Sequence, residues 1–280
     1  MPTDIAKASI VPERAPSADA ARRILARDGA VLLGGVTSGS SVIDLAKELF
    51  GQKLARIEQQ FETTKDIDVK EEARISARPA DSRGRKPYFY GPSERMIPHN
   101  DGFLFTTLAP DYMFLWCERP ALPDGGESFV IDGDALVRLL GESPDTADLA
   151  RFCREVDIDH SDPSSPHQHE APIARRLPNG RLQIRNHHNI AARPGSREDA
   201  DARNVQRWQR ALCESRDCGP MFRMDAGEAI CFDNYRMLHG RDSFDDPGRR
   251  VHAFWVWTTE ALAIPSGTLD LANPGAVPAQ

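Results

Sequence analysis

The chain has no long uninterrupted apolar stretch, although 40% of its 280 residues are hydrophobic. None of its hydrophobic runs approaches the roughly 20 residues of a membrane-spanning helix. The first residues also lack the basic-then-apolar profile of a secretory signal. No segment repeats with the period of a solenoid or propeller. These absences predict a soluble, cytoplasmic protein with one substantial core and no membrane partner.

Excess positive charge and paired cysteines are missing as well. With 35 basic and 42 acidic residues, the formal net charge is -7, so nothing electrostatic indicates a nucleic-acid partner. The cysteines are odd in number, and no two have the spacing of a zinc ribbon or a redox motif. We interpret all five as reduced thiols: Cys117, Cys153, Cys213, Cys218 and Cys231.

The N-terminal part predicts helices around one short strand. Ser17 can cap a helix, residues 30–33 form an apolar strand, and Ser40 or Ser41 begins a second helix. The flanking regions predict less regular structure. We expect a loosely ordered leader over 1–16, a mobile lid or polar insertion over the strongly charged residues 53–86, and a surface tail over 265–280.

Short apolar or alternating runs dominate the rest of the chain, with Gly, Pro, Asn and Asp between them. They predict strands over 112–117, 128–132, 181–186, 228–233 and 250–257. Such a series is typical of a sandwich or barrel, and a jelly roll is the natural candidate. Helices are expected over 134–140 and as an insertion over 196–216, capped by Ser196. The fold class is therefore α+β, mainly β, with one catalytic domain over 17–264.

His99-Asn100-Asp101 is the first feature with chemical content. On an extended segment, residues i and i+2 point to one face, so His99 and Asp101 can reach one ion. His239 follows a later strand and turn. Two imidazoles and one carboxylate form a facial triad, which leaves positions open on iron(II). An isolated His-x-Asp is commonly only a solvated pair, but Pro98 and Gly102 favour a preorganised ligand loop.

Three segments resemble motifs of the taurine dioxygenase (TauD/TfdA-like) superfamily, which includes γ-butyrobetaine hydroxylase. Residues 233–241, DNYRMLHGR, resemble the segment of the distal iron histidine. Residues 97–102, IPHNDG, resemble the His-x-Asp segment, and GGES at 125–128 resembles the Gly-Gly-acidic-Thr/Ser segment. Order and spacing agree from about Gly29 to Trp257. The resemblance implies a double-stranded β-helix of the clavaminate synthase type, with iron held by His99, Asp101 and His239.

The resemblance also implies 2-oxoglutarate and O₂ as co-substrates. An arginine shortly after the distal histidine holds the far carboxylate of 2-oxoglutarate in this family. Arg250 stands at the expected distance, and a guanidinium fork suits a carboxylate. Arg249 is the rival, and it faces the opposite way if the strand begins at Arg250. Ser128 is expected to donate a hydroxyl hydrogen bond to the same carboxylate.

The implied reaction is oxidation of a C–H bond with release of succinate and CO₂. Asp101 favours hydroxylation over halogenation, because related halogenases have a small residue there. Phe254 stands where many taurine-type enzymes have a second arginine, which disfavours a sulfonate substrate. We expect a small polar metabolite, an amino acid or a carboxylic acid. Tyr88 and Tyr90 are pocket candidates, and the predicted substrate residues are Arg95, Asn100, Phe103, Arg185, Asn186 and Trp255.

The remaining histidines predict no second metal site. His160, His167 and His169 are expected in an exposed loop, and the His187-His188 pair at the surface or a pocket rim. His252 is expected to pack beside the co-substrate. Two alternatives stay open: a zinc hydrolase that uses the same three ligands, and a non-catalytic ligand-binding β-helix protein. The sequence also leaves room for a homo-oligomer.

Overall fold

The computed structural model describes residues 4–78, 80, 84–85, 90–163, 169–195 and 197–269. In chain order, its elements are η1 (Ile5–Ala8), β1 (Ser9–Ile10), α1 (Ala18–Asp28), β2 (Ala30–Leu33), α2 (Gly39–Phe50), η2 (Gly51–Lys53), β3 (Leu54–Thr63), α3 (Lys65–Ser76), η3 (Phe103–Leu108), β4 (Tyr112–Arg119), β5 (Ser128–Asp132), α4 (Gly133–Glu142), α5 (Ala147–Glu155), β6 (Ile158–Asp159), β7 (Glu170–Ala171), β8 (Ala174–Arg176), β9 (Leu182–Ile184), α6 (Glu198–Cys218), β10 (Glu228–Asp233), β11 (Met237–Arg241) and β12 (Arg250–Thr258).

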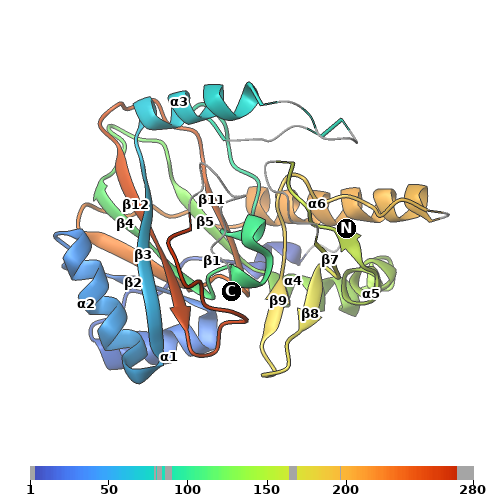
Figure 1. The fold of residues 1–280 in the computed structure, drawn as a ribbon, viewed down its shortest axis with the longest axis horizontal. Helices are drawn as coiled ribbons and strands as arrows, with labels where there is room; N and C mark the ends of the chain where they lie inside the picture. Colours follow the sequence, from blue (N-terminus) through green and yellow to red (C-terminus); the bar gives the residue numbers. More distant parts are fainter. Residues whose placement is uncertain are drawn as a thin grey trace.

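Two antiparallel sheets form the centre of the fold (Figure 1). The major sheet has the strand order β2-β10-β4-β12-β3, and the minor sheet has the order β1-β5-β11. The two sheets face each other as a double-stranded β-helix, which confirms the predicted fold class. Two short hairpins, β6–β7 and β8–β9, lie outside these sheets.

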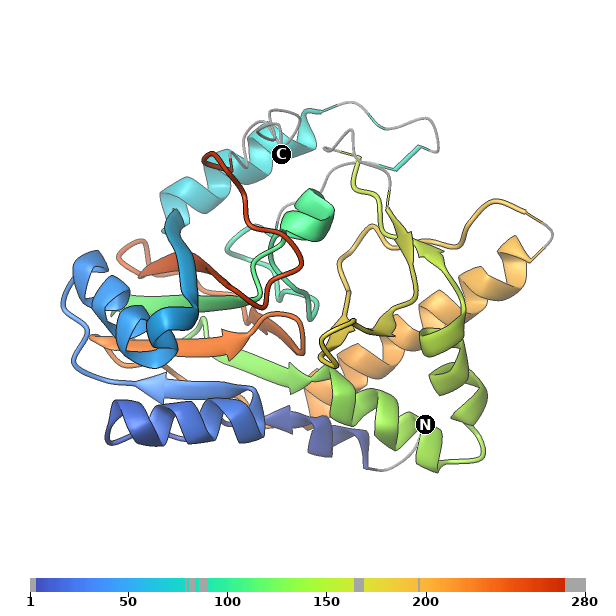
Figure 2. The same ribbon diagram turned by 60° about the horizontal axis from the view of Figure 1, so that its bottom comes forward.

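Alternation along the strands assigns each side chain to a layer. On β11, Met237 points into the core between the sheets, whereas Leu238 packs against the helices outside. Helices α1 and α2 cover the outer face of the major sheet, and α4, α5 and α6 cover that of the minor sheet (Figure 2). Both outer faces are thus buried, and the space between the sheets is left for a site.

The predicted mobile insertion over 53–86 is wrong in its first half. Residues Leu54–Thr63 form β3, which pairs with β12 along nearly its whole length. An edge strand leaves one ladder unpaired and keeps charged side chains, so its sequence does not look like core. The second half contains α3, which lies across one end of the sheets in Figure 1.

The termini are also more integrated than predicted. Ile5 and Ala8 are buried, and β1 pairs with β5, so residues 4–16 are not a loose leader. Leu269 is buried in the core between the sheets, and residues 270–280 lie outside the described part. Helix α6 contributes Trp208 and Leu212 to the outer core and is therefore no mere insertion. The predicted cap, Ser196, lies outside the described residues, and α5 was not predicted.

Candidate metal centre and active site

His99 and His239 come together through backbone pairing. The two residues form an antiparallel bridge: His99 N donates to His239 O at 3.1 Å, and His239 N donates to His99 O at 3.0 Å. Directly opposed residues of an antiparallel pair point to the same face. The imidazole centroids are accordingly 4.6 Å apart. This bridge brings together two histidines that are far apart in the sequence.

Asp101 completes the cluster through a network of asparagines. Asn234 accepts a hydrogen bond from Asp101 N at 3.0 Å and donates to Asp101 O at 2.9 Å. The Asn100 side chain donates to Asn234 O and Met237 O at 2.8 and 3.0 Å. Gly102 then leaves the loop with φ +72°, the left-handed conformation that glycine adopts at little cost. The ligand loop is therefore fixed on both sides of Asp101.

The donor atoms converge as one metal ion requires. Oδ1 of Asp101 lies 3.6 Å from Nε2 of His99 and 3.7 Å from Nε2 of His239. His99 Nδ1 lies 2.9 Å from Ile97 O, so this nitrogen carries the proton and Nε2 is free to coordinate. Among the described residues, these three form the one cluster of potential ligands. The geometry fits a facial triad of iron(II) ligands.

The electrostatics of the cluster also fit a cation. Burial raises the pKa of the Asp101 carboxyl and, together with His99, lowers that of His239 well below its usual value. An ionised carboxylate between two neutral imidazoles is costly in a buried site unless a cation compensates it. The donor set and its environment therefore accommodate a divalent metal.

A cavity of about 70 Å³ lies between the sheets, next to the three ligands. Arg249, Val251 and Ala253 line it, because alternate residues along β12 face inward. Ser128 of β5 lines it too. A cationic side chain and a hydroxyl thus lie beside the metal ligands.

The structure contradicts the placement predicted for Arg250. Its guanidinium lies outside the cavity, with Nε 2.9 Å from Glu62 and Nη1 3.2 Å from Glu118. Arg249 is 5% exposed and lies inside. The two arginines face opposite ways, as the strand periodicity predicted, but it is Arg249 that faces the cavity and Arg250 that faces outward. His252 shares the outer face with Arg250, stacks on Trp116 and is not beside the cavity.

Arg249 is built into the protein closely. Its Nη1 donates to Thr63 Oγ1 at 3.2 Å, and its guanidinium lies 4.5 Å from the Phe244 ring centroid. Gly126 makes room for it, since a Cβ there would come within 2.8 Å of Arg249 Nε. Burial lowers the pKa of Arg249 to about 10, so it stays cationic at neutral pH. None of the described carboxylates lies within 4.0 Å of it, which leaves its charge available to an anionic ligand.

The predicted substrate residues divide into two groups. Arg95 is bound to Asp242 and Asp217 at the surface. Asn100 and Asn186 are clamps, since Asn186 Oδ1 accepts from Trp208 and its amide donates to Pro98 O. None of these three residues lines the cavity beside the metal ligands. Asn186 lines a second, larger cavity that is described below.

The other three lie near the ligand loop. Trp255 donates from Nε1 to Asp101 Oδ2 at 3.0 Å, so it orients a metal ligand. Phe103 stacks on His187 with centroids 4.0 Å apart. Arg185 is 3% exposed and donates to Thr106 O. Trp255 is thus a positioning residue for Asp101, and so is Asn234 through its two hydrogen bonds to the Asp101 backbone. The sequence signal for Asn234 is its place inside the motif of the distal histidine.

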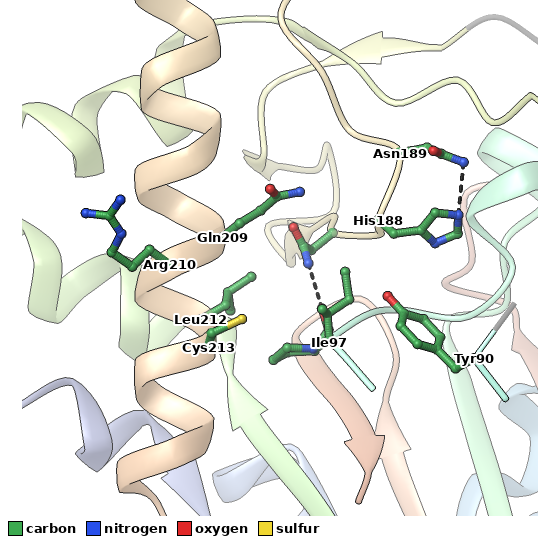
Figure 3. Close-up of a pocket in the computed structure, with 10 residues that line it drawn as sticks. Tyr90, Ile97, His188, Asn189, Gln209, Arg210, Leu212 and Cys213 are labelled. Carbon is green, nitrogen blue, oxygen red and sulfur yellow. Dashed lines mark hydrogen bonds between the residues drawn. The ribbon is translucent and has the colours of Figure 1, made fainter. Parts of the chain in front are cut away.

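A second, larger cavity of about 510 Å³ is lined by Ile97 and Pro98, the two residues before the metal ligand His99 (Figure 3). Figure 3 shows Gln209 and Cys213 of α6 on one side of it, with Tyr90 and His188 on the other. The Tyr90 ring stacks 6.0 Å from His99. The rim position predicted for His188 agrees with this placement. Tyr88 and His167 lie outside the described residues.

The exposed loop predicted for His160 is wrong, because His160 is 2% exposed. The surface or rim position predicted for His187 is also wrong, because His187 is fully buried. His169 is partly buried. The sequence around them is rich in Ser, Pro and Asp, which is typical of a surface loop. Contacts between separate segments enclose them instead: His160 N donates to His169 O beside the β6–β7 pair, and His187 stacks on Phe103. Local composition does not report such contacts.

A double-stranded β-helix with a His-Asp-His cluster beside a buried arginine defines a class, the non-haem iron(II) oxygenases that depend on 2-oxoglutarate. The chain belongs to the taurine catabolism dioxygenase TauD, TfdA family, whose model matches residues 4–257. No curated protein matches the chain. Among the described residues, no helix is both long enough and apolar enough to cross a membrane.

Solved structures share the fold at low sequence identity. An asparagine oxygenase in complex with Fe(II), 2S,3S-3-hydroxyasparagine and succinate matches at 17% identity and a TM-score of 0.55, covering 86% of this chain and 77% of that one. The non-haem iron oxygenase OrfP, in complex with Fe and α-ketoglutaric acid, matches at 18% and 0.54, covering 87% and 79%. PvcB, an Fe, α-ketoglutarate-dependent oxygenase of an isonitrile synthetic pathway, matches at 13% and 0.53, covering 86% and 80%.

Proposed function

We propose that this dioxygenase hydroxylates a C–H bond of a small amino acid or carboxylic acid, with iron at His99, Asp101 and His239. The observation that carries the proposal is the placement of Arg249 and Ser128 beside those ligands in one cavity. When bound, iron(II) with 2-oxoglutarate and O₂ supplies the oxidising chemistry that ends in succinate and CO₂. The residues of the chain bind, orient and exclude water.

Arg249 replaces Arg250 as the residue that holds the far carboxylate of 2-oxoglutarate. Its fork can donate two parallel hydrogen bonds, and its surroundings are apolar on the Phe244 side. Ser128 is placed to donate a hydroxyl hydrogen bond to the same carboxylate. Trp255 keeps the Asp101 carboxylate turned toward the two histidines. Met224, Leu115 and Val251 give the cavity apolar walls that keep water out.

Two observations support a small polar substrate, and a third concerns the type of reaction. The asparagine oxygenase and OrfP structures contain 3-hydroxyasparagine and, in another complex, (3S)-hydroxy-L-Arg, each as that protein's ligand. Position 253, four residues after Arg249, is alanine, so the second arginine of many taurine-type enzymes is missing in this register too. Asp101 supplies the carboxylate ligand, which favours hydroxylation over halogenation. A cytoplasmic location and a homo-oligomer remain predictions.

The test is an anaerobic titration of 2-oxoglutarate into the iron(II)-loaded protein, followed by the visible charge-transfer band. Arg249→Met should raise the dissociation constant roughly 100-fold, because hydrogen bonds to a charged group contribute about 1.5–3 kcal/mol each. Arg250→Met is the matched control and should stay within about twofold. Loss of binding in the Arg250 variant alone would overturn the assignment to Arg249.

The zinc hydrolase alternative predicts a different outcome from the same sample. It requires no 2-oxoglutarate, so the wild-type protein would show no charge-transfer band and would retain zinc instead. A zinc hydrolase would not need Arg249, which is buried beside the metal ligands without a carboxylate partner among the described residues. The geometry therefore favours the oxygenase.

A further inference from the structure

Two arginines line the cavity beside the metal ligands, and they use their hydrogen-bond donors differently. Among the described residues, the Arg249 guanidinium donates to Thr63 Oγ1 alone. Arg241 is 4% exposed, and its Nη1 and Nη2 donate to four backbone carbonyls, those of Tyr90 (3.2 Å), Gly91 (3.1 Å), Glu94 (2.9 Å) and Asp242 (3.2 Å). Its terminal N–H groups are therefore occupied, so a carboxylate in the cavity finds free donors on Arg249 and not on Arg241.

Three of these carbonyls belong to one turn, residues 90–94, which lies shortly before the metal ligand His99 in the sequence. Glu94 N closes the turn by donating to Gly91 O at 3.2 Å. Phe244 N donates to Pro92 O at 2.8 Å, so the loop after β11 holds the same turn. The turn is thus fixed to the end of β11 by a buried guanidinium and by the backbone.

Tyr90 begins this turn, and its side chain reaches the metal centre. The Tyr90 ring stacks on His99 with centroids 6.0 Å apart and an interplanar angle of 28°. It meets His188 edge-on, with centroids also 6.0 Å apart. Tyr90 and His188 both line the larger cavity, as Figure 3 shows. The placement of the turn therefore determines which ring packs against a metal ligand and forms that wall of the larger cavity.

The position of Arg241 in the strand explains how it reaches both regions. It is two residues after His239 on β11, so the two side chains lie on the same face of the strand and line the same cavity. The carbonyls that it binds are divided between Nη1 and Nη2. A guanidinium presents its donors in a planar fork, whereas a lysine ammonium carries three donors on one atom. The arrangement requires the fork and not merely a positive charge.

We propose that Arg241 is a positioning residue that holds Tyr90 against the metal ligand His99. It acts through the backbone of residues 90–94 and is not a ligand of the co-substrate. The inference goes beyond the proposed function, because it concerns how one wall of the metal centre is held and not which substrate is oxidised.

The experiment follows the Tyr90 ring by fluorine NMR of protein labelled with fluorotyrosine. The chain contains four tyrosines, and the resonance that disappears in Tyr90→Phe is that of Tyr90. Paramagnetic cobalt(II) at the metal ligands should shift this resonance relative to diamagnetic zinc(II), because the ring stacks on His99. Arg241→Met and Arg241→Lys are made in an Asp68→Asn background, since loss of Arg241 would otherwise strand the buried Asp68 carboxylate.

Both Arg241 variants should lose most of the cobalt-induced shift that the Asp68→Asn parent shows. Arg216→Met is the matched control, because Arg216 Nη1 donates to Met96 O at 2.9 Å, in the same segment but outside the turn. It should keep the shift. The resonances of Tyr112 and Tyr235, which pack around Arg181, should stay in place and report an intact fold.

Three results would overturn the inference: an unchanged shift in both Arg241 variants, a wild-type shift in Arg241→Lys, or an equal loss in Arg216→Met. The first removes the link to Tyr90, the second makes the charge sufficient, and the third makes the effect a general loosening of the segment.

The anaerobic titration of 2-oxoglutarate separates the roles of the two arginines. Arg241→Lys keeps the charge and should bind 2-oxoglutarate within about tenfold of its parent, in contrast to the roughly 100-fold loss expected for Arg249→Met. A loss in Arg241→Lys as large as that in Arg249→Met would make Arg241 a co-substrate ligand and contradict the inference. If the wild type shows no charge-transfer band, the proposed function fails, and the comparison of cobalt(II) with zinc(II) still decides the role of Arg241.

Discussion

At the scale of single residues, Trp255 determines how the metal ligand Asp101 is presented. Its indole Nε1 donates to Asp101 Oδ2, which leaves Oδ1 facing both histidines. Partners of this kind fix the orientation of a ligand, and their loss costs about 10–100-fold in metal affinity. Trp255 itself is 1% exposed, so its ring is held by the core and cannot turn away from Asp101.

We therefore predict that Trp255→Phe weakens iron(II) or cobalt(II) binding by at least about tenfold while the protein stays folded. Trp257→Phe is the control: it lies on the same strand and face, but its Nε1 donates to Leu108 O. Equilibrium titration with cobalt(II), followed by its visible absorption, compares the two. Equal affinities would mean that Trp255 does not orient Asp101.

The same scale shows what the sequence could and could not predict about the site. His99, Asp101 and His239 were predictable, because i, i+2 spacing and the distal motif define them locally. The choice between Arg249 and Arg250 was not. It depends on which face of β12 points inward, and a register irregularity between Arg250 and Val251 disturbs the pairing with β4 at that point. Asn100 was wrongly predicted to contact the substrate. Its side chain instead holds backbone carbonyls in the core, and the local sequence does not distinguish these two roles of an asparagine.

At the scale of elements, one buried carboxylate on helix α3, that of Asp68, lies against an arginine that lines the cavity beside the metal ligands. Asp68 is 1% exposed, and its Oδ2 lies 3.5 Å from Arg241 Nη2. Its Oδ1 is buried without a partner. Burial raises the pKa of Asp68 to about 6, although Arg241 and Arg249 act in the opposite direction. The helix thus places a poorly solvated carboxylate next to the arginine assigned to 2-oxoglutarate.

The pH dependence of stability follows from that shift. The folded state binds the Asp68 proton more tightly than the unfolded state, so the stabilising contribution is complete below pH 3.8 and is lost as the pH rises through about 6. Relative to Asp68→Asn, the wild type should lose up to about 3 kcal/mol between about pH 4 and pH 7. Urea unfolding at several pH values, without co-substrate, measures the difference.

A second helix position provides the control for this measurement. Asp66 is exposed on α3, so Asp66→Asn should give a stability curve parallel to that of the wild type. Parallel curves for the wild type and Asp68→Asn would show that the ionised carboxylate is not destabilised in the fold.

The elements also separate what composition predicts from what it does not. Helix α1 was predictable, because Ser17 accepts from Ala20 N as a cap and one face is apolar. Strand β3 was not, because its burial comes from pairing with β12 and not from its own pattern. The helix α3 has one buried residue, Asp68, and no apolar stripe to indicate its packing. Local hydrophobic periodicity therefore does not predict an element that is held in the fold by pairing at a sheet edge or by a single buried charge.

At the scale of the whole molecule, the metal centre connects the loop that carries His99 and Asp101 to the two-sheet core. The segment carrying His99 and Asp101 is not part of either sheet. It pairs with β11 through three backbone hydrogen bonds, two between His99 and His239 and one from Met96 N to Arg241 O, and the Asn100 and Asn234 side chains hold it as well. His239 belongs to the minor sheet, and Trp255 to the major one. A metal ion bound to all three ligands therefore ties the ligand loop to the two-sheet core, an arrangement that the unfolded chain does not preform.

A ligand that binds only the folded state stabilises it by RT ln(1 + [L]/Kd), about 2.7 kcal/mol at a concentration of 100 Kd. For a domain of this size each kcal/mol raises the melting temperature by about 2–4 °C, so saturating iron(II) should raise it by about 5–10 °C over the chelator-treated protein. Asp101→Ala should lose most of that increase, whatever its own starting stability. Anaerobic calorimetry with and without metal measures both. An equal rise in Asp101→Ala would place the stabilising ion elsewhere, since the carboxylate is the charged ligand of the cluster and a site without it would bind iron(II) far more weakly.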